Sequence, residues 1–306
     1  AKAKCTVNKN ITLYAVQKKA VQLTFHRCDG STWQKTTLAK GSSYSLPGVR
    51  DAEGYTFMGW STKPMQSVSP QYEAEEKITV NGNVDLYAVV FNRTTETDLT
   101  EDQLPQVDIY KYKQVIFVGD SRTEFMENVL TGMGESATKN VKFVCSAGKG
   151  LDWFTTTGWA QLYSIVQHDS NSILSKKTAV IFNFGVNDLS KSADYAEYYN
   201  WIAPQLKSKG CELYFMSVNP VNRLMLPNAG RSDRSEAAVR SFNQYMKANL
   251  SSAYTYIDMY SYLKSTGYSF ASDHYGTGTV DDGLHYTTRT YKRIFAKCMD
   301  SLRVPA

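Results

Sequence analysis

The sequence predicts an α/β protein, in which a three-layer α/β/α domain with a parallel sheet follows a small β-rich domain. Two observations predict this arrangement. After residue 113, short apolar runs alternate with longer stretches of helical periodicity, which is typical of a parallel sheet covered by helices on both faces. Before residue 93, an internal repeat combines alternating apolar residues with turn signals, and this combination indicates strands.

The N-terminal repeat is visible as two similar segments, TVNKNITLYAV at residues 6–16 and TVNGNVDLYAV at residues 79–89, which agree at eight of eleven positions over an offset of 73 residues. Only one full copy fits, over residues 20–92. We therefore expect residues 1–19 to be the remnant of a preceding repeat, and the chain to be a C-terminal fragment from which a signal peptide is absent.

The full copy resembles the internalin B-repeat, also called the Listeria–Bacteroides repeat. The resemblance rests on GYTFMGW at residues 54–60 and LYAV at residues 86–89. It implies a secreted or bacterial cell-surface protein, with possible cell-wall association through the repeats. We expect Trp60 to fill the core of this small domain rather than to form a ligand platform.

Residues 93–113 form a Thr-rich acidic segment, with five acidic and no basic residues between positions 94 and 108. We expect a solvated linker here. Beyond it, residues 114–306 form the α/β domain. Its expected strands are 115–118, 141–145, 179–184, 213–218 and 254–257, and its expected helices are 123–130, 153–167, 193–207, 235–250 and 288–302.

Charge and composition exclude several classes of protein. The net charge is +5. There are 14 basic and 12 acidic residues up to position 113, and 20 basic and 17 acidic residues after it. Neither part has a basic stripe that would suggest a nucleic-acid partner. No apolar run approaches the length of about 18 residues that a transmembrane segment needs. The five cysteines form no CxxC pair; Cys145 and Cys211 are expected to be buried, and a bond between Cys5 and Cys28 is left open.

A serine, a histidine and an aspartate stand where an acyl-transfer site needs them. Ser121 follows a predicted strand by a two-residue turn and opens a helix, where the helix N-terminus favours an oxyanion. A serine hydroxyl needs a base, and of the four histidines only His285 has a useful partner, Asp282, three residues before it. Gly148 and Asn187 each follow another predicted strand, from which a backbone N–H and an amide could donate to an oxyanion.

The order Ser121, Gly148, Asn187 and Asp282-x-x-His285 resembles the SGNH hydrolase family, also called GDSL esterases/lipases, over nearly all of residues 114–303. The resemblance implies an SGNH-hydrolase-like fold with Ser121 as nucleophile, His285 as base and Asp282 orienting His285. It also implies an oxyanion hole formed by the N–H groups of Ser121 and Gly148 and by the Asn187 amide. Asp120 and Asp188 are expected to brace the loops.

Other chemistries have no motif here: G-x-S-x-G, H-E-x-x-H and P-loop patterns are missing, and no Cys/His cluster suggests a metal or cofactor. The sequence has no apolar insertion that could form a lid, so we expect the substrate to carry a short acyl group such as acetyl. We expect the carrier of this group to be a carbohydrate or cell-wall glycan. Arg122, Trp153 and Arg223 are candidate substrate-binding residues, although helix packing and surface charge are alternatives. The alternative functions are a lipase or thioesterase on longer acyl chains, or a non-catalytic glycan-binding adhesin.

Overall fold

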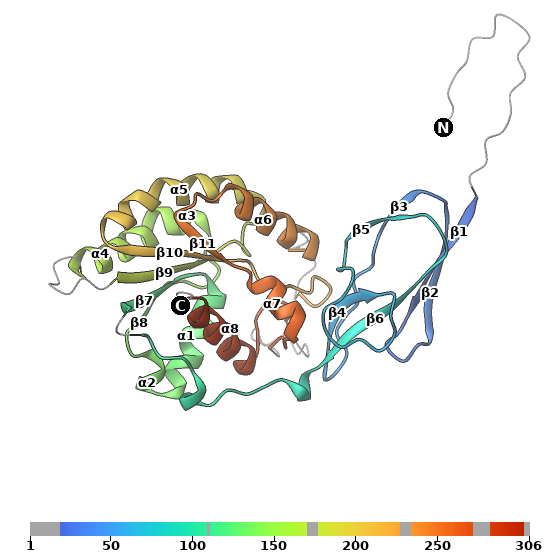
Figure 1. The fold of residues 1–306 in the computed structure, drawn as a ribbon, viewed down its shortest axis with the longest axis horizontal. Helices are drawn as coiled ribbons and strands as arrows, with labels where there is room; N and C mark the ends of the chain where they lie inside the picture. The colour runs from blue at the N-terminus through green and yellow to red at the C-terminus, as the bar shows by residue number, and fades with distance from the viewer. Residues whose placement is uncertain (1–18, 109–110, 170–176, 227–233, 272–281, 303–306) are drawn as a thin grey trace, which may run out of the picture.

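The computed structural model describes residues 19–108, 111–169, 177–226, 234–271 and 282–302. A β-rich N-terminal region lies beside an α/β region, and helix α7 (Met259–Thr266) lies on the side of the α/β region that faces the N-terminal strands (Figure 1). This arrangement confirms the predicted fold class. No helix in the described part of the chain is long and apolar enough to span a membrane.

The N-terminal region is built from a four-stranded sheet in the order β2-β1-β6-β4 and a separate β3-β5 pair. Trp60 is fully buried in the hydrophobic core of this region. The ring nitrogen of Trp60 donates to the Pro47 carbonyl at 2.8 Å. The prediction that Trp60 packs in the core is therefore confirmed. The strands are β1 (Ala20–His26), β2 (Thr32–Ala39), β3 (Ser42–Ser45), β4 (Tyr55–Ser61), β5 (Lys77–Val80) and β6 (Val84–Asn92).

The α/β region contains a five-stranded parallel sheet in the order β11-β10-β9-β7-β8. All five strands overlap the predicted ones, because apolar residues on both sides of a parallel strand produce a continuous hydrophobic run. The chain's first strand of this sheet, β7, lies between β8 and β9. The bounds are β7 (Tyr112–Gly119), β8 (Val141–Cys145), β9 (Lys177–Asn183), β10 (Cys211–Met216) and β11 (Tyr254–Ile257).

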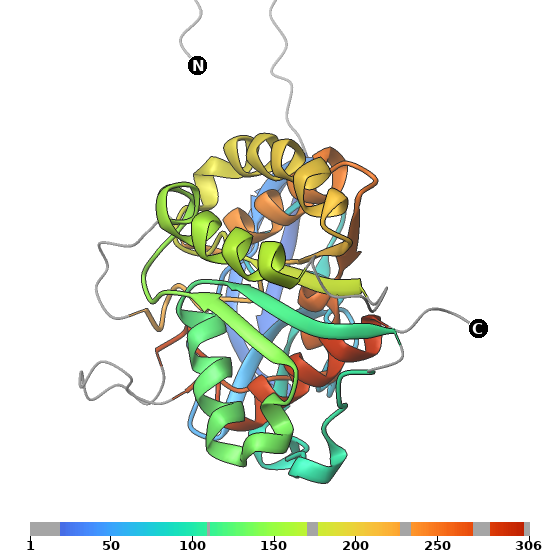
Figure 2. The same ribbon diagram turned by 90° about the vertical axis from the view of Figure 1, so that its left-hand side faces the viewer.

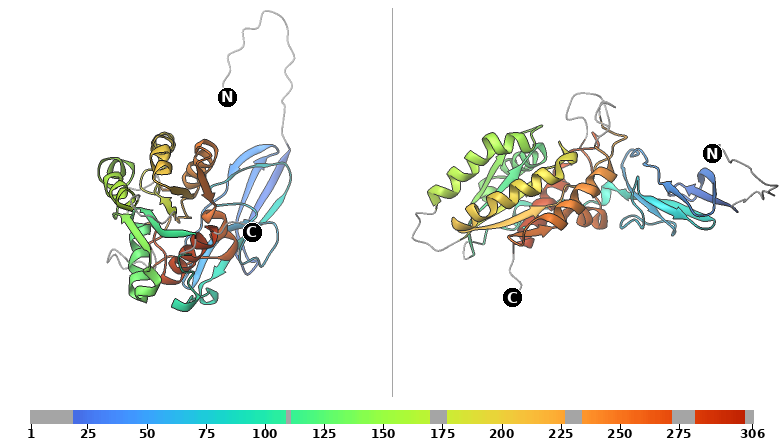
Figure 3. Two further views of the ribbon diagram at one scale, coloured as in Figure 1. Left: turned by 60° about the vertical axis from the view of Figure 1, so that its left-hand side comes forward. Right: turned by 90° about the horizontal axis from the view of Figure 1, so that it is seen from above.

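Helices cover both faces of this sheet (Figures 2 and 3). One face packs against α3 (Leu151–Trp153), the π-helical turn Phe154–Gly158, α4 (Trp159–Asp169), α5 (Ser192–Ser208) and α6 (Glu236–Asn249). The other face packs against α1 (Ser121–Met133), α2 (Glu135–Thr138), α7 and α8 (Thr288–Ser301). The expected single helix 153–167 is thus divided by the π-helical turn, and α2 and α7 were not predicted.

The segment between the two regions is not solvated throughout, which corrects the expectation for residues 93–113. It contains two short 3-10 turns, Arg93–Thr95 and Glu101–Gln103. Glu96, Leu104 and Val107 are buried against the α/β region. The Glu96 carboxylate accepts hydrogen bonds from Ser269 at 2.5 Å and Arg293 at 3.0 Å, and also from Thr290. The prediction of a solvated linker rested on the acidic, Thr-rich composition of the segment, which does not show that Glu96 has partners in distant parts of the chain.

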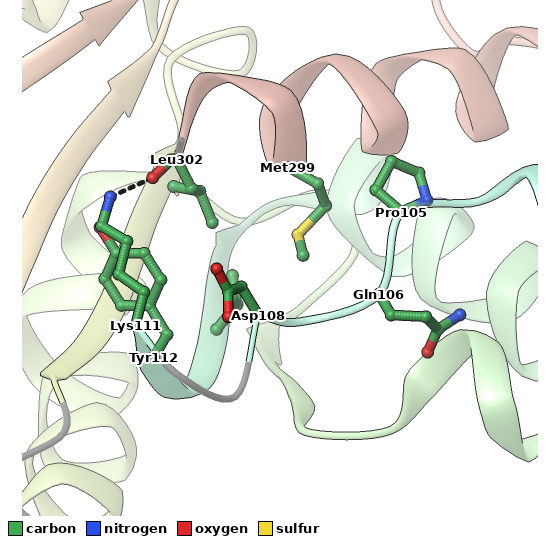
Figure 4. Close-up of a pocket in the computed structure, with 8 residues that line it drawn as sticks. Pro105, Gln106, Asp108, Lys111, Tyr112, Met299 and Leu302 are labelled. Carbon is green, nitrogen blue, oxygen red and sulfur yellow. Dashed lines mark hydrogen bonds between the residues drawn. The ribbon is translucent and has the colours of Figure 1, made fainter. Parts of the chain in front are cut away.

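A cavity of about 460 Å³ lies where this segment meets the end of α8 (Figure 4). Pro105, Asp108 and Met299 are among the residues that line it, and Lys111 donates to the Leu302 carbonyl at its border. The cavity is at the amino end of β7. Ser121 follows the opposite end of that strand, so this cavity is separate from the candidate site.

The cysteines divide between buried and exposed positions. Cys211 is buried as predicted, whereas Cys145 is only partly buried and its thiol contacts the Glu127 carboxylate at 3.3 Å. Cys28 is exposed, and Cys5 lies outside the described residues. Within the described ranges, no group of three or more His, Cys, Asp or Glu side chains is placed to hold a metal ion.

Candidate active site

Ser121 is held at the carboxyl end of β7 by a tight strand-to-helix turn. Asp120 caps α1, and its carboxylate accepts a hydrogen bond from the Arg122 N–H at 3.0 Å. A side chain at Gly119 would not fit, because its Cβ would lie 2.0 Å from the Thr123 hydroxyl oxygen. The turn therefore places Ser121 as the first residue of α1, at the edge where neighbouring strands β8 and β9 also end.

The structure brings Ser121, His285 and Asp282 together in one chain of hydrogen bonds. The Ser121 hydroxyl lies 2.9 Å from Nε2 of His285, and Nδ1 of His285 lies 2.6 Å from Oδ2 of Asp282. His285 is fully buried and only 5% of Ser121 is exposed. A carboxylate at Nδ1 favours the tautomer with the proton on that nitrogen, in which Nε2 is a hydrogen-bond acceptor for the serine hydroxyl.

The turn from Asp282 to His285 fixes this geometry. Oδ1 of Asp282 accepts the backbone N–H groups of Leu284 at 2.9 Å and His285 at 2.7 Å, so the second carboxylate oxygen points at the ring. Gly283 has a φ of +64°, a conformation that side chains rarely adopt. The ring of Phe125 packs edge-on against His285 with centroids 4.5 Å apart, which restricts rotation of the imidazole.

Gly148 and Asn187 follow the two strands that flank β7, and their loops contact each other. The Asn187 amide donates to the Lys149 carbonyl at 2.7 Å, and the Ala147 N–H donates to Glu124 of α1 at 2.7 Å. Gly148 is exposed, with a φ of +71° and open space where a side chain would point. Position 148 therefore favours glycine because of its backbone conformation, not because a side chain would clash with neighbouring atoms.

Asp188 braces the loop that carries Gly148, as predicted. Its carboxylate accepts hydrogen bonds from the Leu151 N–H at 2.9 Å and the Tyr195 hydroxyl at 2.7 Å. Burial raises the pKa of Asp188, against the opposing effect of these hydrogen bonds. Burial also raises the pKa of the helix-capping Asp120 to about 6, although the Arg122 N–H and guanidinium favour its ionised form. Both carboxylates contact the scaffold rather than the serine.

Arg234 is a residue of the site that the sequence did not reveal. Its side chain is buried, and it donates to Oδ1 of Asn187. Its charge also acts on Asp120. Arg234 precedes α6, far from every predicted motif, so only the tertiary structure identifies it.

Arg122 does not have the position predicted for a substrate-binding residue. It is 2% exposed, and its guanidinium donates to the backbone carbonyls of Leu284 at 3.0 Å, Asn219 at 2.9 Å and Pro220 at 2.9 Å. The prediction is wrong because these donors face backbone oxygens inside the protein. Arg122 instead links the start of α1 to the His285 turn and to residues 219–220.

Arg223 and Trp153 also have other partners. Arg223 forms an ion pair with Glu75 of the N-terminal region at 3.0 Å, and its side chain is 45% exposed. Trp153 packs against Phe184 and the π-helical turn, the helix-packing alternative for this residue. Among the other aromatic residues near predicted loops, Tyr195 and Tyr199 are fully buried, whereas Trp201 is 59% exposed.

Two family models match the chain. Residues 22–89 match the Listeria-Bacteroides repeat domain, and residues 115–298 match the GDSL-like Lipase/Acylhydrolase family. A comparison with curated proteins found no match.

Similar solved structures include a protein described as an acylhydrolase from Bacteroides fragilis, with 16% identity and a TM-score of 0.44 over 66% of this chain and 92% of that one. An SGNH hydrolase from Slackia heliotrinireducens has 12% identity and a TM-score of 0.44 over 63% and 100%. An acetyl xylan esterase has 12% identity and a TM-score of 0.41 over 62% and 100%.

The α/β region is therefore that of a serine ester hydrolase. The chain belongs to the GDSL-like lipase/acylhydrolase family, whose model covers residues 115–298, more than half of its length.

Proposed function

We propose that this hydrolase removes short acyl groups, acetyl above all, from a carbohydrate or cell-wall glycan by a Ser-His-Asp mechanism. The observation that carries the mechanism is the hydrogen-bonded chain from Ser121 through His285 to Asp282. The low exposure of Ser121, 5%, supports a small acyl group. The repeat domain supports a secreted or cell-surface location, where glycans are available substrates.

In the proposed reaction, Ser121 Oγ attacks the ester carbonyl while His285 Nε2 accepts its proton. The tetrahedral intermediate collapses when the imidazolium returns that proton to the departing alcohol, and an acyl-serine remains. Water then attacks the acyl-serine with His285 again as base, which releases the carboxylic acid and restores the serine. Asp282 keeps the imidazole oriented and stabilises its charged form in both steps.

The developing oxyanion would be bound by the N–H groups of Ser121 and Gly148 and by the Asn187 amide. One Asn187 amide hydrogen is used by the Lys149 carbonyl, so the other supplies the donation to substrate. The link between the Asn187 and Gly148 loops supports their joint action, because it holds two donors of one hole in a fixed relationship.

Hydrolysis of p-nitrophenyl acetate, butyrate, octanoate and palmitate tests the chain length, with Ser121→Ala and the exposed Ser190→Ala as a matched pair. We expect activity on the acetate and butyrate esters, loss with Ser121→Ala and no change with Ser190→Ala. Activity that rises with chain length would instead assign a lipase. No turnover by the unmodified protein, together with glycan binding that survives Ser121→Ala, would assign an adhesin.

Asp282→Asn tests the proposed role of the carboxylate. An amide at this position no longer holds the Nδ1 proton, so we expect kcat to fall about 10³-fold or more. Acetate release from acetylated xylan and from O-acetylated peptidoglycan then distinguishes the two classes of glycan. A protein that hydrolyses p-nitrophenyl acetate but releases acetate from neither polymer would contradict the glycan assignment.

A further inference from the structure

One turn of the α/β region separates the repeat domain from the catalytic histidine. This turn, residues 219–226, contacts the N-terminal region on one side and the Asp282–His285 turn on the other. Arg122 and Tyr286 hold its beginning, because both donate to the Pro220 carbonyl, Tyr286 at 2.5 Å. The turn is therefore fixed to both the nucleophile helix and the histidine turn.

On the repeat side, the turn is held by Asn222. Its side-chain amide donates to Oδ1 of Asp51 at 2.9 Å and to the Val49 carbonyl at 3.1 Å. The Asp51 side chain is fully buried and is itself fixed by the Phe57 N–H at 2.9 Å and by Arg93 at 2.7 Å. A buried carboxylate with three such donors has one well-defined position, and it determines the position of Asn222.

On the catalytic side, the same residue contacts Gly283. The Asn222 N–H donates to the Gly283 carbonyl at 2.8 Å, and a Cβ added to Gly283 would lie 2.4 Å from the Asn222 carbonyl oxygen. Gly283 lies directly between Asp282 and Leu284 in the turn that aims the carboxylate at His285. One residue thus joins a buried carboxylate of the repeat to the backbone of the catalytic turn.

We propose that the repeat domain is a positioning element of the active site, and that Asn222 is the positioning residue through which Asp51 aligns Asp282 and His285 with Ser121. The inference rests on the proposed catalytic roles of those three residues. Alignment matters because a misplacement of about 1 Å costs about 100-fold in rate. The repeat then has a role in catalysis itself, in addition to any role in attachment.

The remainder of the interface shows that the repeat is in a position to act in this way. Met58, Val89 and Phe91 of the repeat share a buried hydrophobic cluster with Leu263 and Tyr268 of the α/β region. Polar contacts surround this cluster: Arg50 to the Leu224 carbonyl, Arg223 and the Ala237 N–H to Glu75, Arg240 to the Ala74 carbonyl, and Lys264 to the Met58 carbonyl. An interface of this kind holds the repeat against the α/β region, and no single one of these polar contacts touches Asp51.

The test uses three variants: Asn222→Ala, Asp51→Ala and the double variant that combines them. The control is Arg240→Met, which removes a contact across the same interface without touching residues 219–226 or 282–285. The readouts are kcat and KM for p-nitrophenyl acetate, the pH dependence of kcat/KM, and the rate at which a fluorophosphonate reagent modifies Ser121. Thermal unfolding of each variant ensures that the assays use folded protein.

We expect each single variant to lose about tenfold in kcat, with little change in KM and a shifted acidic limb of the pH profile, because the histidine is less well held. The double variant should lose no more than the single ones, since both substitutions remove the same contact. Arg240→Met should retain the unmodified kcat and pH profile. If Asn222→Ala does not fold, Asp51→Ala tests the contact from the repeat side.

Unchanged kcat and phosphonylation in Asn222→Ala and Asp51→Ala would overturn the inference, as would an equal loss in Arg240→Met. The phosphonylation rate separates this outcome from failure of the proposed function. If the unmodified protein is phosphonylated at Ser121 but hydrolyses none of the esters, the substrate assignment is wrong, and the variants still report whether the repeat aligns the histidine.

Discussion

The guanidinium of Arg234 donates a hydrogen bond to the side-chain oxygen of Asn187, and this contact fixes the orientation of the Asn187 amide. With the oxygen turned to Arg234, the amide nitrogen points to the Lys149 carbonyl, to which it donates at 2.7 Å. The buried cation thus orients a donor of the proposed oxyanion hole.

Arg234→Met tests this orientation. The variant keeps the aliphatic stem but removes the donor, so we expect kcat to fall about tenfold with little change in KM. In an Asn187→Ala background the same substitution should add little, because the group that it orients is gone. Steady-state kinetics of the four proteins give the coupling. The half-exposed Arg289→Met is the control, and independent, multiplicative effects would refute the assignment.

Gly283→Ala and Gly132→Ala form a pair with opposite expected effects on stability. Gly283 has a positive φ and faces the Asn222 carbonyl, so alanine there should cost more than about 1 kcal/mol of unfolding free energy. Gly132 lies in α1 with open space around it, so alanine should stabilise the helix by about 0.5–1 kcal/mol. Urea denaturation measures both. A Gly283→Ala protein as stable and active as the unmodified one would contradict the geometry of the turn.

Asp120 makes the stability depend on pH. Its pKa in the folded protein is raised to about 6 by burial, above its unfolded value, so the folded state binds the proton more tightly. The contribution of this group to stability is therefore largest below about pH 4 and is lost as the pH rises to about 6.5, by up to about 3 kcal/mol.

Asp120→Asn should flatten this part of the profile, because an asparagine still caps the helix but does not titrate. Asp188, whose pKa burial also raises, contributes a slope in the same direction. Urea unfolding at several pH values between about 4 and 7 measures the difference between the two proteins. Parallel profiles would show that Asp120 is not the titrating group.

Lys264 lies buried between the two regions, with its ammonium 2.9 Å from Glu73, 3.0 Å from Glu236 and 2.8 Å from the Met58 carbonyl. Burial disfavours its charged form, but the two carboxylates outweigh this effect and raise the pKa of Lys264. Lys264→Met should cost about 3 kcal/mol or more, since it leaves buried carboxylates without their cation.

Adding Glu236→Gln to Lys264→Met should recover part of that loss, because it removes one of the uncompensated charges. The exposed Lys247→Met is the control and should change the unfolding free energy by less than about 0.5 kcal/mol. Denaturant unfolding compares the four proteins. A double variant less stable than Lys264→Met would argue against an electrostatic origin.

The sequence predicts elements better than it predicts contacts between them. The five strands could be predicted because a strand that is buried on both faces has an uninterrupted apolar run. Ser121 and His285 could be predicted because each lies in a short local motif. The π-helical turn at Phe154–Gly158 was not predicted, because it is a single turn inside a stretch that was assigned to one continuous helix. The roles of Arg122 and Arg234 could not be predicted, because their hydrogen-bond partners are oxygen atoms of residues that are distant in the sequence.

The buried Glu96 changes where the catalytic unit begins. Its carboxylate is a partner of Arg293 in α8, although Glu96 precedes the first strand of the parallel sheet. A fragment that starts at residue 114 would leave an arginine of the last helix without its acid. The joining segment is therefore the first packed stretch of the α/β region, and a domain boundary drawn at residue 114 would cut through its hydrophobic cluster.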